Sequence, residues 1–85
     1  MHPDDIKTII EQGLPCTHVS VNGDGRHFEA VIVSEAFRGT RTLAQHRLVY
    51  GTLGDRFDTE LLHALSIKTY TPEQWTQVGA APQPS

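Results

Sequence analysis

His63 is the side chain of this 85-residue chain best suited to bind a metal or a partner. It heads a segment in which Leu65 and Ile67 alternate with polar residues, a pattern typical of a half-buried strand. An imidazole at the rim of a sheet can bind a metal through one nitrogen while the other donates a hydrogen bond. The shared parity with Leu65 and Ile67 also allows the alternative of a partly buried, structural histidine.

Two other patterns carry weaker chemical signals. Cys16 and His18 lie two residues apart on an expected strand, where an imidazole could activate a thiol. The alternative is a half-buried free cysteine beside a surface histidine. Gly51 and Gly54 match the Gly-x-x-Gly loop with which KH domains bind nucleic acid, but no cluster of lysine or arginine flanks them to contact phosphates.

The remaining histidines have less specific positions. His46 lies in an expected helix among apolar residues and is interpreted as a histidine at the edge of the core, and His2 as a surface residue. His27 lies where the chain returns from a predicted hairpin loop into a strand. Paired carboxylates, a Walker-type phosphate loop and a Gly-x-Ser-x-Gly elbow are all missing from the sequence, so its motifs do not indicate an enzyme.

The chain must position these residues with short alternating elements. We predict a first helix over residues 3–12, because Pro3 suits its first turn and apolar residues recur at helical spacing. We then predict strands over 17–21 and 27–34, joined by a hairpin at residues 22–25, which read Asn-Gly-Asp-Gly. The first helix should bury one apolar stripe, formed by Ile6, Ile9, Ile10 and Leu14. The second strand should bury the face that carries Phe28, Ala30 and Ile32.

A second helix, a third strand and a third helix complete the expected order. The second helix is predicted over 42–53, and Thr71, followed by a proline and then Gln74, should form a capping box that starts the third helix. Trp75 is expected to anchor that helix to the core. The apolar stripe of the second helix is expected to contain Leu43, His46, Tyr50, Leu53 and Phe57. The result is a small α+β domain of order αββαβα, a three-stranded sheet with helices packed on one side.

Composition limits the classes of protein to which the chain can belong. The net charge of −3 and the pI near 5.9 argue against a dedicated nucleic-acid binder, which usually carries a basic face. A single cysteine excludes an internal disulfide, and neither a signal-peptide pattern nor an apolar run of membrane-spanning length occurs. We therefore expect one cytoplasmic domain over residues 1–78 with a flexible tail over 79–85, no membrane association, and a monomer when alone.

Residues 21–28, 33–39, 46–50 and 63–75 form an ordered series of segments. Together they resemble the BolA family, and within it the IbaG-like branch. The match runs over about residues 5 to 76, and its most specific part is His-Ala-Leu-Ser-Ile-Lys-Thr-Tyr-Thr-Pro-Glu-Gln-Trp, which begins at His63. The resemblance implies an αββαβα fold related in shape to class II KH domains.

The resemblance also implies a non-enzymatic role. BolA-like proteins pair with monothiol glutaredoxins, and the pair holds a [2Fe–2S] cluster to which the glutaredoxin contributes its cysteine and a bound glutathione thiolate. The BolA-like partner contributes a histidine at the position of His63. A second ligand, histidine or cysteine, lies in the loop between the first two strands, where His27 is the only suitable residue nearby. The implied role is iron–sulfur cluster trafficking or iron and redox sensing, with no cluster on the isolated chain.

A DNA-binding regulator is the competing hypothesis, because some BolA-like proteins are regarded as transcription regulators and the KH-like shape supports this by analogy. The part of the chain that matches the presumed DNA-binding helix of the family contains Arg41, Arg47 and Lys68. Gln45, however, stands where many relatives have a basic residue. With the acidic net charge, any DNA binding is expected to be weak. A third possibility is an adaptor that docks the glutaredoxin without a cluster.

Overall fold

A computed structural model of the chain describes residues 2–24, 26–54 and 63–80. Only the backbone is described for residues 79 and 80. The predicted αββαβα order is confirmed, and both long helices end within one residue of their predicted bounds. The elements are α1 (Pro3–Gly13), β1 (His18–Gly23), β2 (Phe28–Val33), the 3₁₀ turn η1 (Glu35–Phe37), α2 (Thr42–Leu53), β3 (Leu65–Tyr70), α4 (Pro72–Trp75) and a π-helical turn (Thr76–Ala80).

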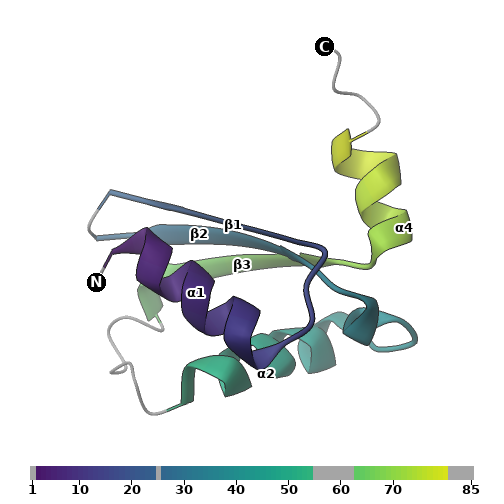
Figure 1. Ribbon diagram of the computed structural model, residues 1–85, viewed down its shortest axis with the longest axis horizontal. Coiled ribbons are helices and arrows are strands. Elements are labelled where there is room, and N and C mark those ends of the chain that lie inside the picture. The colour runs from purple at the N-terminus through teal and green to yellow at the C-terminus, as the bar shows by residue number, and fades with distance from the viewer. Residues whose placement is uncertain (1, 25, 55–62, 81–85) are drawn as a thin grey trace.

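The sheet has the order β1-β2-β3, with β1 antiparallel to β2 and β2 parallel to β3. Its two ends carry different elements, the β1–β2 hairpin at one and α4 at the other. At the hairpin end, Phe28 pairs with both Gly23 and Leu65, so β2 and β3 start where the β1–β2 loop turns. At the α4 end, Val33 pairs with His18 and Tyr70. Figure 1 shows the two ends at opposite sides of the molecule.

The core lies between the sheet and the two long helices, α1 and α2. Side chains of the predicted stripes fill it, which confirms the pattern for α1 and β2. Its buried members are Ile6, Ile10, Leu14, Val19, Phe28, Ala30, Ile32, Phe37, Val49, Leu53, Leu65 and Ile67.

The predicted stripe of α2 is wrong at its first position. Leu43 is 64% exposed, whereas Gln45 is 6% exposed and shares the buried face with Val49 and Leu53. The side-chain amide of Gln45 donates to the carbonyl oxygens of Phe37 (3.2 Å) and of the neighbouring turn residue Thr40 (3.0 Å). A count of apolar residues cannot detect a buried position whose occupant is a hydrogen-bonded amide. Phe57, the last expected member, lies outside the described residues.

The helix α4 begins as predicted but does not anchor Trp75 in the core. Thr71 and Gln74 form the capping box. Trp75 is only partly buried: its ring stacks on that of His18, with centroids 5.1 Å apart, and lies 5.5 Å from that of Tyr70. The core prediction is wrong because a single residue, Thr71, separates β3 from α4, so the helix stays beyond the strand end, away from α1 and α2 (Figure 1).

The rings at the α4 end form a small second cluster on the outer face of the sheet. Val33 is fully buried although it does not belong to the main core. Its two neighbours in the sheet are His18 and Tyr70, the residues whose rings contact Trp75. The aromatic side chains of this cluster therefore cover the end of the face that α1 and α2 leave open.

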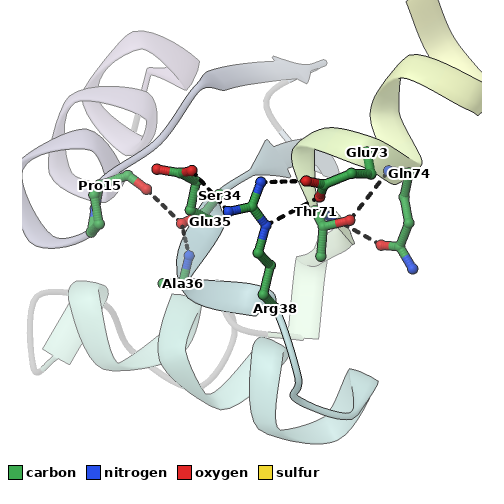
Figure 2. A network of polar contacts seen from close by, with 8 residues as sticks. All are labelled: Pro15, Ser34, Glu35, Ala36, Arg38, Thr71, Glu73 and Gln74. Atoms are coloured by element: carbon green, nitrogen blue, oxygen red, sulfur yellow. Dashed lines mark hydrogen bonds and ion pairs between the residues drawn. The ribbon is translucent and has the colours of Figure 1, made fainter.

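Polar contacts tie α4 to η1, as Figure 2 shows. The guanidinium of Arg38 forms a two-pronged ion pair with Glu73 and a second ion pair with Glu35 at 3.0 Å. In the same network, the Ser34 hydroxyl donates a hydrogen bond to the carbonyl oxygen of Pro15 and accepts one from the N–H of Ala36. The ion pairs therefore fasten the short helix α4 to the turn that leads into α2.

Candidate functional site

His63 lies at the hairpin end with its side chain exposed. His63 and Ala64 have helical backbone conformation, and β3 begins only at Leu65. The prediction that His63 is the first residue of the strand is therefore wrong. The reason is the register, since Leu65 pairs with Phe28 and β2 has no earlier residue to continue the ladder. The exposure of His63 excludes the alternative of a partly buried, structural histidine.

His27 lies at the same end of the sheet. It is exposed and is the last residue of the hairpin loop before β2 begins at Phe28. Because β2 and β3 run parallel, His27 and His63 come just before the paired residues Phe28 and Leu65. The two histidines predicted as ligands therefore lie at the same end of the sheet.

Asp24 holds the loop that carries His27. Its Oδ1 accepts the backbone N–H groups of Arg26 and His27, each at 2.8 Å, and its own N–H donates to the carbonyl oxygen of His27 at 3.1 Å. The N–H of His27, followed by that of Arg26, lowers the pKa of Asp24 by stabilising its carboxylate. The sequence analysis missed this role, although an aspartate that bonds the backbone two residues on is a known turn pattern.

An open, shallow pocket of about 200 Å³ adjoins His27. Its lining contains two carboxylates and one amide besides the imidazole: Asn22, Gly23, Asp24, His27 and Glu29. The hairpin end therefore offers an accessible imidazole beside an open depression whose lining residues include Asp24 and Glu29.

Comparison with known proteins decides the family. The family model described as BolA-like protein matches residues 3–74. The chain belongs to the BolA family. The Acid stress protein IbaG of Escherichia coli (strain K12) is 35% identical over 77 residues, which cover 91% of this chain and 92% of that protein.

Two further relatives agree. The DNA-binding transcriptional regulator BolA of Vibrio cholerae is 41% identical over 76 residues, which cover 89% of this chain and 68% of that protein. A solved structure of a BolA protein homologue from Coxiella burnetii has a TM-score of 0.77 and 47% identity, covering 88% of this chain and 96% of that one. These matches confirm the predicted BolA family and its IbaG-like branch, and they confirm the fold class.

The imidazoles of this BolA-like chain fit part of an iron–sulfur site. Imidazole is a known ligand of [2Fe–2S] iron, and such a cluster takes four ligands. Two exposed histidines at one end of the sheet can supply at most two. Within residues 2–24, 26–54 and 63–80, no group of three or more His, Cys, Asp or Glu side chains is placed to hold a metal. The described residues would therefore hold such a cluster only together with ligands from elsewhere.

Cys16 and His18 do not form a reactive pair. Cys16 packs against the main core, and burial, followed by the charge of Glu11, raises the pKa of its thiol. His18 instead stacks on Trp75. Strand β1 begins only at His18, so strand alternation does not govern the direction of Cys16. The alternative of a half-buried free cysteine beside a surface histidine is confirmed.

Within the described residues, the two glycines and the basic residues Lys68 and Arg47 are not gathered on one surface. Gly51 lies inside α2 and Gly54 is its C-cap, so this Gly-x-x-Gly segment is a helix end rather than a loop. The hydroxyl of Thr69 on β3 donates to Gln45 of α2 at 2.6 Å, so α2 covers that face of the strand. Lys68, the preceding residue, points to the opposite face and away from the exposed Arg47 of α2.

Gln45, which belongs to the region considered for DNA binding, is itself buried and is therefore not a surface site in this chain. None of the helices in the described part of the chain is long and apolar enough to cross a membrane. Residues 79 and 80 of the predicted tail belong to the π-helical turn, and residues 81–85 lie outside the described residues.

Proposed function

We propose that this BolA-like protein is the partner of a monothiol glutaredoxin and that the two chains hold a [2Fe–2S] cluster between them. His63 and His27 would supply the imidazole ligands, and the glutaredoxin cysteine and a bound glutathione would supply the thiolates. One observation carries the proposal: parallel pairing of β2 and β3 brings both exposed histidines to the hairpin end. The proposed role is non-enzymatic.

The ligand type suits a cluster that is passed on or sensed. Replacing thiolates by neutral imidazoles on one iron raises the reduction potential. Imidazole binds metal only when it is unprotonated, so acidification favours its release from the iron. Both histidines are exposed and reachable by protons from solvent. These properties support a role in iron–sulfur cluster trafficking or in iron and redox sensing.

The proposal is tested by reconstitution. The purified chain is mixed with a monothiol glutaredoxin, iron, sulfide and glutathione, and visible absorption and circular dichroism spectra are recorded. We expect a spectrum that differs from that of the glutaredoxin reconstituted alone, in a complex of one chain of each kind. The chain alone serves as the control and should bind no stable cluster. A coloured, iron-loaded monomer, or a glutaredoxin spectrum unchanged by this chain, would contradict the proposal.

The cluster-free adaptor is a distinct outcome of the same experiment. In that case the two proteins form a complex by gel filtration or calorimetry, but the cluster spectrum stays that of the glutaredoxin alone. His63→Ala would then leave the affinity for cluster-free glutaredoxin and the spectrum unchanged.

DNA binding is the second candidate function, favoured by the name of the Vibrio cholerae relative. Because Lys68 and Arg47 lie on different faces, few phosphate contacts can form together, and we expect nonspecific binding no tighter than roughly 10⁻⁴–10⁻⁶ M near physiological salt. Protonated histidines should strengthen binding near pH 6 and lose that effect by pH 8. Gel-shift titrations with a scrambled competitor measure this. Sequence-specific, nanomolar binding at pH 7.5 would make DNA regulation the main function.

A further inference from the structure

The loop between β1 and β2 is fixed at its base by a close approach that only glycine permits. A Cβ atom on Gly23 would lie 2.3 Å from Cδ1 of Phe28 and 3.0 Å from the carbonyl oxygen of His27. The Phe28 side chain, 3% exposed, belongs to the main core. The absence of a side chain at Gly23 therefore lets a core ring pack directly under the loop.

Asp24 bonds to Arg26 and His27 of the same loop. Three hydrogen bonds join it to the residues that follow: two from backbone N–H groups to its carboxylate and one from its own N–H to the His27 carbonyl. The carboxylate bonds are charge-assisted and therefore stronger than bonds between neutral groups. Both the N–H and the C=O of His27 are thus bonded to one residue, although the imidazole remains exposed.

We propose that Asp24 is a positioning residue that fixes His27 at the hairpin end before any partner binds. This inference rests on the proposed function, in which His27 is a ligand contributed to a shared cluster. A mobile loop would have to be ordered on complex formation, and that conformational entropy would weaken the complex. A loop already bonded through Asp24 avoids this loss, because ligand-bearing residues act best when a second layer of bonds holds them.

Three variants separate positioning from charge. Asp24→Ala removes the acceptor of both N–H groups. Asp24→Asn removes the charge but keeps a side-chain oxygen that can accept the same bonds. Glu29→Gln is the matched control, because Glu29 lines the same pocket and forms none of the described loop bonds.

The first measurement is made on the free protein. Amide hydrogen exchange by NMR should show the N–H groups of Arg26 and His27 exchanging about tenfold faster in Asp24→Ala, since each loses a bond to a carboxylate. Asp24→Asn should restore most of the protection, and Glu29→Gln should leave it unchanged. The melting temperature should change little in all three, because the loop is exposed. Exchange rates in Asp24→Ala within twofold of the parent would overturn the inference, whatever the fate of the proposed function.

The second measurement is made on the heterodimer with glutaredoxin. The visible circular dichroism and the rate of cluster loss of Asp24→Ala should shift toward those of His27→Ala, while Asp24→Asn and Glu29→Gln should match the parent. If His27→Ala alters the spectrum and Asp24→Ala does not, positioning by Asp24 is refuted and the proposed function stands. If the parent forms no shared cluster, the proposed function fails, and the exchange measurement alone decides whether Asp24 holds His27.

Discussion

The two ends of the sheet use histidine in different ways. At the α4 end, the ring of His18 stacks on Trp75 and helps to cover the outer face of the sheet. At the hairpin end, His27 and His63 are exposed, and the bonds described for His27 involve only its backbone. The ring of His18 is thus engaged by a neighbouring side chain, whereas the bonds described for His27 leave its ring uncovered.

The connections explain why the two ends differ. At the α4 end a one-residue connection places a helix directly beyond β3, so rings and charged groups crowd together there. At the hairpin end, β2 and β3 both begin. Each strand follows a connecting segment there, whereas at the other end β3 leads directly into α4. Loop residues lie on the surface and are free to carry function, whereas the opposite end is devoted to packing.

The largest expected effect separates the two kinds of histidine directly. His63→Ala should speed cluster loss from the glutaredoxin complex by at least about tenfold, because it removes a ligand rather than an outer contact, and should leave the melting temperature unchanged. His18→Ala is the matched control, and it should lower the melting temperature while preserving the parent spectrum. Cluster spectra and thermal melts of both variants measure this. Identical cluster spectra and lability in His63→Ala and the parent would show that His63 is not a ligand.

Gln45→Ala should cause the largest loss of stability. Gln45 is buried and bonded to the carbonyls of Phe37 and Thr40 and to the Thr69 hydroxyl. Removing the amide leaves these groups without that partner, which should lower the free energy of unfolding by about 2–3 kcal/mol and the melting temperature by roughly 10–20 °C. The exposed Gln12→Ala in α1 serves as the control and should change little. Equal melting temperatures for the two variants would show that the amide bonds contribute nothing net.

Trp75→Ala should have a smaller effect, because the ring is only partly buried. A fully buried tryptophan truncated to alanine costs about 3–5 kcal/mol, so we expect about 1–2 kcal/mol here, measured by urea unfolding. Val78→Ala is the control, because Val78 is 55% exposed. A loss as large as that of a core residue would mean that the cluster at the α4 end is part of the main core.

The smallest effect concerns pH and the ion pair of α4. The Arg38 guanidinium lowers the pKa of Glu73, so the stabilisation is present above the unfolded value of about 4.3 and is lost as pH falls through the lower folded value. Both side chains are exposed, so the effect should be slight. The melting temperatures of the parent and Glu73→Gln should differ at pH 7 and converge below about pH 4. A difference that grows on acidification would have the opposite sign and contradict this account.

Much of the local structure follows from residue type and spacing alone. Capping residues determine where α4 begins, and the residues between β1 and β2 determine the hairpin, because both depend on bonds within a few positions. The αββαβα order and the apolar face of α1 follow from periodicity. The ordered segments that resemble BolA proteins also predicted the family, because they extend over most of the chain.

The tertiary structure decided what depends on partners distant in the chain. Burial of Gln45 in place of Leu43 depends on carbonyl groups and a hydroxyl outside α2. The periodicity of apolar residues within the helix carries no information about these partners. The place of Trp75 depends on the direction in which a one-residue connection sends α4. His27 and His63 reach the same end of the sheet because β2 pairs in parallel with β3. Long-range pairing, not local propensity, builds the candidate site.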